Sequence, residues 1–73
     1  MVWKPADDNN WLTEMHGCTL RAMRRIDGGA WWAIVVDPDG HTSGAGPFAM
    51  RIWAQARAEQ IASRIIVDGG STL

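Results

Sequence analysis

Cysteine is almost absent from this chain, since Cys18 is the only one among 73 residues. An internal disulfide is therefore excluded, and a small protein without one is typical of a reducing compartment. A structural zinc site needs four well-placed ligands, which one cysteine and two irregularly spaced histidines, His16 and His41, do not supply. We expect neither a metal nor another cofactor.

Long apolar runs are also missing. No segment approaches the roughly 20 apolar residues that span a bilayer, and the N-terminus lacks the apolar stretch of a signal peptide. We therefore expect a cytoplasmic protein with no membrane partner.

Catalytic motifs are scarce. Gly28-Gly29 and Gly44-Ala45-Gly46 do not continue into the Gly-Lys-Ser/Thr of a phosphate-binding loop. Cys18 could pair as a thiol nucleophile with His16 or His41 as a base, but no third group orients them. Cysteine is also among the most buried residue types. The sequence therefore predicts that the protein is not an enzyme.

An excess of positive charge is lacking as well, because the formal net charge is −1. A general phosphate binder normally carries a clear basic excess, so broad nonspecific binding to DNA is not expected. The basic residues are nevertheless six arginines and one lysine. Arginine is the residue preferred for specific pairing at interfaces, so this bias favours a defined partner.

Tryptophan, by contrast, is abundant. The five tryptophans are Trp3, Trp11, Trp31, Trp32 and Trp53. Each can bury about 150–250 Å², and a single small domain spanning residues 1–73 can hardly enclose all of them. We expect two or three in the core and the others partly exposed. Dense packing or a homodimer should supply the stability that no disulfide provides.

The first half of the chain predicts one firm strand. Residues 1–10 read as an irregular N-terminal arm, because Pro5 and a polar cluster at 7–10 interrupt regular structure. Residues 11–15 are compatible with a strand or a helical turn. Residues 18–26 alternate as a strand, and Asp27-Gly28-Gly29 follows as a hairpin turn. The two sides of this strand are Cys18, Leu20, Ala22 and Ile26 on one, and Thr19, Arg21, Met23 and Arg25 on the other.

A second strand is predicted over residues 30–36, which are apolar on both sides. Such a strand is central in its sheet, or has one side covered by a helix and the other by a partner, and we expect Trp32, Ile34 and Val36 to be buried. Asp37-Pro38-Asp39-Gly40 predicts a turn, which accounts for both aspartates without a cation. Residues 41–45 can form a short third strand that runs back along the second.

A helix is predicted over about residues 47–67, with proline at its first position and glycines after its end. Because residues 65–67 are β-branched, the helix could instead end before them and the chain continue as an edge strand. Stepping about 100° per residue places one apolar stripe toward the core: Met50, Ala54, Ala58, Ile61, Ala62 and Ile65. The predicted fold is therefore α+β, an antiparallel two- to three-stranded β-meander packed against one C-terminal α-helix.

The arginines mark a candidate partner-binding surface. On the helix, Trp53, Arg57 and Arg64 fall on one edge beside the core stripe. On the first strand, Arg21 and Arg25 share one side. Tryptophan and arginine are enriched among the residues that dominate protein–protein binding. A solvated helix flank, in which arginine stems cover Trp53, is the alternative.

The strand at 31–36, the turn at 37–40, a short strand and an alanine-rich helix form a ββα pattern over residues 29–62. This pattern resembles the arm-type DNA-binding modules of phage integrases. It also resembles small phage proteins that inhibit bacterial defence complexes, the anti-CRISPR proteins. The first resemblance implies DNA contacts from basic residues on the sheet, but the second strand here has none and the third offers only His41.

The anti-CRISPR resemblance implies a protein partner, such as a CRISPR effector complex that handles nucleic acid. We therefore predict a non-enzymatic binding protein, a small phage or mobile-element inhibitor or adaptor that binds a host protein complex. The alternative is a small DNA- or RNA-binding module.

Overall fold

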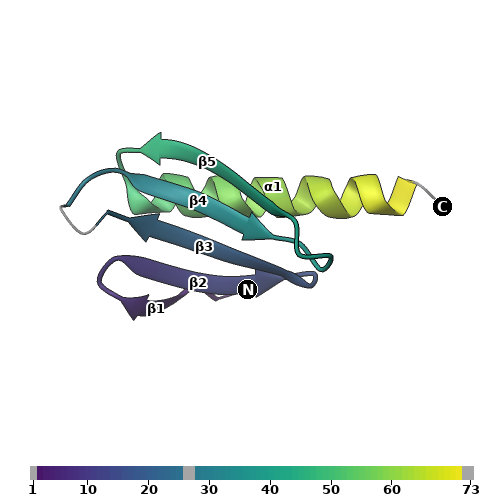
Figure 1. Ribbon diagram of the computed structural model, residues 1–73, viewed down its shortest axis with the longest axis horizontal. Coiled ribbons are helices and arrows are strands. Elements are labelled where there is room, and N and C mark those ends of the chain that lie inside the picture. Colours follow the sequence, from purple (N-terminus) through teal and green to yellow (C-terminus); the bar gives the residue numbers. More distant parts are fainter. Residues whose placement is uncertain (1, 26–27, 72–73) are drawn as a thin grey trace.

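The computed structural model describes residues 2–25 and 28–71, with the side chains of the C-terminal helix described as far as Ile65. The elements are β1 (Lys4–Asp7), β2 (Asn10–Met15), β3 (Cys18–Arg24), β4 (Trp31–Val36), β5 (Thr42–Phe48) and α1 (Arg51–Ser71). The strands form one antiparallel sheet in the order β1-β2-β3-β4-β5, so each strand pairs with its neighbour along the chain. The helix α1 lies along one face of this sheet (Figure 1), which confirms the α+β class.

The sheet has five strands, whereas the sequence predicted two or three. The irregular arm predicted for residues 1–10 is wrong, because Lys4–Asp7 is strand β1 and Asn10 begins β2. Pro5 is tolerated in β1 because this strand lies at the edge of the sheet, where one side of the backbone needs no ladder hydrogen bond. Residues 11–15, for which the sequence allowed either a strand or a helical turn, belong to a strand.

Two tight turns join the central strands. His16 and Gly17 have φ of 53° and 84°, the pair of positive values that a two-residue type I′ hairpin turn requires. This turn was not predicted, since asparagine or aspartate, and not histidine, is the usual first residue. The predicted turn at residues 37–40 is confirmed, with the Gly40 amide donating to the Asp37 carbonyl at 2.9 Å and Gly40 at φ 89°.

The third and longest connection joins β3 to β4. Gly28 has φ 80° and its amide donates to the Arg25 carbonyl at 3.0 Å, as expected of a turn glycine. Ile26 and Asp27, which were predicted to be a core residue and part of the turn, lie outside the described residues.

The helix begins four residues later than predicted, because Pro47 belongs to β5. The carbonyl of Met50 accepts hydrogen bonds from the amides of Trp53 and Ala54, which defines the first turn of α1. Residues 65–67 are helical, and α1 continues through the two glycines to Ser71, since glycine lowers helix propensity without forbidding it. Among the described residues, no helix combines the length and apolar character needed to cross a membrane.

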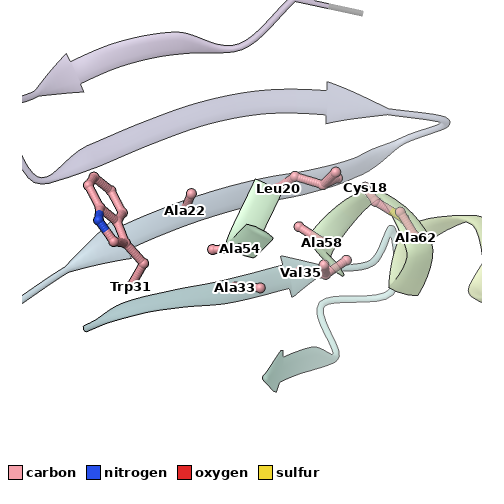
Figure 2. Packing of buried hydrophobic residues seen from close by; sticks show 9 residues of the cluster. All are labelled: Cys18, Leu20, Ala22, Trp31, Ala33, Val35, Ala54, Ala58 and Ala62. Carbon is pink, nitrogen blue, oxygen red and sulfur yellow. The ribbon is translucent and has the colours of Figure 1, made fainter. Parts of the chain in front are cut away.

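The core lies between α1 and the sheet (Figure 2). Its nine buried residues are Cys18, Leu20, Ala22, Trp31, Ala33, Val35, Ala54, Ala58 and Ala62. The predicted alternation of β3 is confirmed, with Cys18, Leu20 and Ala22 facing the helix, and so are the alanines of the predicted helix stripe. Because so many of these side chains are alanine, the helix backbone can approach the sheet closely, and few large side chains fill the space between them.

The predicted orientation of β4 is wrong. Trp31, Ala33 and Val35 face the helix, while Ile34 and Val36 are only half-buried and Trp32 is 37% exposed on the opposite side. Both sides of this strand are apolar, so alternation could not show which one meets α1. In the predicted helix stripe, Met50 is 48% exposed, whereas Ile61 and Ile65 are half-buried against the core.

Two side-chain contacts attach α1 to the N-terminal strands. The Arg51 guanidinium lies 3.9 Å from the ring centre of Trp11 on β2, a cation–π contact. The indole Nε1 of Trp3, just before β1, donates to the Glu59 carboxylate at 2.9 Å. Glu59 therefore faces the β1–β2 side of the sheet, so the opposite flank of α1 faces the β5 side.

Candidate binding surfaces

The predicted helix residues lie together on the flank of α1 that faces β5. Stepping about 100° per residue, Trp53, Arg57 and Arg64 fall within about 40° of one another, and Met50 directly precedes the helix. These four residues are called the helix surface below. Trp53 is 53% exposed, Arg64 is exposed and Arg57 is half-buried, with its Nη1 donating to the Gln60 side-chain oxygen.

Met50 and Ile52 are exposed residues that the sequence analysis did not assign to a surface. Met50 had been placed in the core stripe because the helix was predicted to start at Pro47. With the helix beginning at Arg51, Met50 precedes its first turn and is open to solvent. Ile52 is as exposed as Trp53 but lies about 100° away around the helix. An apolar residue outside the core stripe was the available signal for Ile52.

The other two predicted site residues lie elsewhere. Arg21 is exposed on β3, and since side chains alternate along a strand, it lies on the face opposite to Leu20 and the helix. Arg25 is exposed just after the end of β3, so the strand does not carry both arginines as predicted. The structure therefore separates Arg21 from the helix surface by the thickness of the sheet.

The face of the sheet turned away from α1 is called the open face below. Its side chains form three rows across the strands, which the pairing register defines. The rows are Asp7, Asn10, Met23 and Trp32; then Lys4, Leu12, Arg21, Ile34 and Gly44; and then Glu14, Thr19, Val36 and Thr42. Arg21 lies at the middle of this face, on the central strand, with Leu12, Ile34 and Met23 around it.

The remaining tryptophans have structural roles. Trp31 is buried, and the Arg24 guanidinium lies 5.1 Å from its ring centre. Arg24 also donates through Nε to the Asn9 side-chain oxygen at 3.1 Å, which ties β3 to the turn between β1 and β2. Trp3 and Trp11 are half-buried against the core. Trp32 and Trp53 are therefore the two most exposed tryptophans, as expected if only some of the five could be enclosed.

The turn at residues 37–40 groups three potential ligands. The ligating atoms of Asp37, Asp39 and His41 lie within 4.8 Å of one another. However, Oδ1 of Asp37 already accepts from the amides of Asp39 and His41, each at 2.9 Å. The His41 imidazole lies 3.5 Å from the other Asp37 oxygen. The Asp37 carboxylate thus organises the turn, which is the role predicted for it.

Cys18 lies in the core with no exposed surface. Burial, and to a lesser extent the charge of Asp37, raises the pKa of its thiol. A nucleophilic cysteine is partly exposed and has a lowered pKa. Cys18 is instead fully buried, and the pKa of its thiol is raised. The structure therefore supports a core role for Cys18 rather than a catalytic one.

The raised pKa of Cys18 predicts how stability depends on pH. The unfolded thiol, with a pKa of about 8.5, ionises before the folded one, so the folded state holds its proton over a window in which the unfolded state has lost it. The free energy of unfolding should therefore fall as the pH rises above about 8.5. Urea denaturation between pH 7 and pH 10 should show this slope in the wild type and a flatter one in Cys18→Ala.

Few other groups interfere with this measurement, because the chain has no tyrosine and only one lysine. Cys18→Ala also leaves a small cavity, so its stability should be lower at every pH. The slope, not the absolute value, is the readout. Equal slopes in both proteins would show that the Cys18 thiol ionises alike in the folded and unfolded states.

Comparison of the chain with protein-family models, with curated proteins and with solved structures found no match.

Proposed function

We propose that this protein is a non-enzymatic binding protein that recognises another protein through the helix surface. The observation that carries the proposal is the exposure of Trp53 and Met50 beside two arginines, on a helix whose inward side is alanine. Exposed tryptophan and arginine side chains are the types most often found among the residues that dominate protein–protein affinity. The net charge of −1 favours a protein partner over a phosphate backbone.

The resemblance to small phage inhibitors suggests the kind of partner. A host protein complex that handles nucleic acid, such as a CRISPR effector, is the proposed target. The protein would act as an inhibitor or adaptor by covering a surface that the complex needs. This proposal rests on the ββα pattern of residues 29–62 and on the helix surface, and it requires no cofactor or catalytic group.

The alternative function is a small DNA- or RNA-binding module. The observation in its favour is that Lys4, Arg21 and Trp32 share the open face. Sheet faces that bind single-stranded nucleic acid combine basic residues with aromatic rings on which bases stack. Glu14 on the same face weakens this alternative, because its carboxylate repels phosphate.

The test is affinity capture from host-cell lysate with the wild type, Trp53→Ala, Arg57→Ala and Ile52→Ala. A protein captured by the wild type should survive nuclease treatment. Truncation of a dominant contact residue costs about 2 kcal/mol or more, so the affinity of the purified partner should fall about thirtyfold for Trp53→Ala. Ile52→Ala removes an equally exposed apolar side chain from a different side of the helix and should change affinity little.

Salt dependence separates the two functions. Binding through a few dominant contacts should respond modestly to salt, whereas phosphate binding should weaken steeply. In the second case, each Arg→Ala change should flatten the slope of log affinity against log salt by about one. Capture that vanishes with nuclease and is unaffected by Trp53→Ala would refute the proposed use of the helix surface.

A further inference from the structure

The apolar side chains of β4 are divided almost evenly between two faces, although α1 covers only one of them. Trp32, Ile34 and Val36 lie on the open face, where β2 and β3 add Leu12 and Met23. A sheet with one face in solvent normally alternates apolar and polar side chains. The open face departs from this pattern along β4, whose three outward side chains are all apolar.

Nothing in the described part of the chain covers this face. The helix contacts β3, β4 and β5 from the core side, and Figure 1 shows no other layer on the sheet. The backbone groups of the inner strands are engaged in the ladder, so an occupant must contribute side chains rather than a pairing strand. The occupant is therefore another apolar surface.

The glycines of β5 keep one side of the open face flat. A Cβ on Gly46 would come within 2.7 Å of Cε3 of Trp32, so the indole ring lies directly against the backbone of β5. Gly44, beside Ile34, adds no side chain to the face. A flat apolar sheet face is complementary to a second flat sheet, and two such faces pack about 10 Å apart.

The size of the face fits a dimer interface at the lower end of the usual range. Strands about 4.8 Å apart, with a rise of about 3.3 Å per residue, give the sheet a footprint of roughly 20 Å by 20 Å. Side chains raise the accessible area above this footprint. Two such faces together would bury about 1,000 Å² or somewhat more, which is the minimum expected for a specific interface.

The charges on the open face are complementary to those of a second copy. Arg21 on β3 and Glu14 on β2 are both exposed there, on adjacent strands, and β1 adds one charge of each sign, Lys4 and Asp7. A two-fold axis in the interface can place Arg21 of one copy against the partner's Glu14, and the reverse contact then follows by symmetry. Pairing matters here, because an arginine buried without a counter-charge would strongly oppose association.

From these observations we propose that the open face is the interface of a homodimer, on which the same face of a second copy packs. The dimer is sheet on sheet, with the two helices on the outside. Trp32, Ile34, Leu12 and Met23 form the apolar part of the interface around Arg21, and Arg21 and Glu14 form reciprocal ion pairs. The helix surface stays free, so the dimer is independent of the proposed binding function.

Sedimentation equilibrium of the purified full chain over a wide concentration range tests the proposal. The wild type should change from monomer to twice that mass as concentration rises. Ile34→Lys replaces an apolar side chain of the interface with a second positive charge beside Arg21 and should weaken association at least about thirtyfold. Ile52→Lys, the same substitution on the exposed side of α1, should leave association unchanged, and so should Trp53→Ala.

Charge reversal provides a second test that does not touch the half-buried side chains. Arg21→Glu and Glu14→Arg should each weaken the dimer, because each brings like charges together. The double variant should restore it. Circular dichroism at low concentration, where the wild type is monomeric, should show that all these variants remain folded.

Three results would overturn the homodimer. The first is a wild type that stays monomeric up to millimolar concentration, which would leave the face to a different protein. The second is a dimer that Ile34→Lys does not weaken. The third is a single-stranded DNA oligonucleotide that binds the wild-type monomer and is released by Ile34→Lys, which would assign the face to nucleic acid. Failure of the double variant to restore association would overturn the Arg21–Glu14 pairing.

Discussion

Leu20→Ala is expected to lower the free energy of unfolding by about 2–5 kcal/mol, the usual cost of truncating a buried leucine. Leu20 is the largest fully buried side chain in the described part of the chain. The fully buried side chains that α1 contributes to the core are all alanines, which cannot move far enough to fill the space that Leu20 leaves. A domain this small has a total stability near the lower end of about 5–15 kcal/mol. The variant should therefore be largely unfolded at 37 °C.

Urea denaturation followed by circular dichroism measures this effect. Ile52→Ala is the matched control, since it removes a similar side chain from an exposed position on α1. Surface substitutions of this kind usually change stability by about 0.5 kcal/mol or less. A Leu20→Ala midpoint equal to that of the control would mean that the space between β3 and α1 is not the packed core described above.

Ala58→Asp should have a comparable or larger effect. Ala58 has no exposed surface, and Figure 2 shows it over the part of the sheet that carries Leu20 and Val35. A carboxylate there would meet apolar side chains and no described cation of the core. An uncompensated buried charge typically costs about 3–5 kcal/mol, so we expect α1 to detach or the chain to unfold.

The control is Ala56→Asp, the same substitution on the exposed side of the same helix. Both variants lose the same helix propensity, so the difference between them isolates burial. Thermal melts of the two proteins at neutral pH give this difference directly. Comparable melting temperatures would contradict the position of the alanine stripe against the sheet.

The helix surface and the open face lie on opposite sides of the molecule, so both can be occupied at the same time. A dimer through the open face would carry two helix surfaces, one on each outer side. Two linked binding sites raise the apparent affinity for a partner that presents two copies of its own site. Weakening of the dimer by Ile34→Lys would then reduce binding to a multimeric partner without changing the affinity of a single site.

The candidate site was predictable in part. The helical period alone brought Trp53, Arg57 and Arg64 to one edge, because 3.6 residues per turn fixes relative directions within a helix. It could not place Arg21 relative to them, since that depends on which side of β3 meets α1. The exposure of Met50 depended on the exact start of the helix, and a proline at residue 47 suits a helix start and an edge strand equally.

By itself, the sequence determined the α+β class, the alternation of β3, the turn around Pro38 and Gly40, and the alanine stripe of α1. These features are local, since each follows from side-chain period or from the backbone angles of a few residues. Only the tertiary structure decided that Pro5 lies in an edge strand and that Trp31, not Trp32, faces the helix. A strand that is apolar on both sides has two equivalent ways to meet a helix, and the choice depends on how the neighbouring strands pair and where α1 packs.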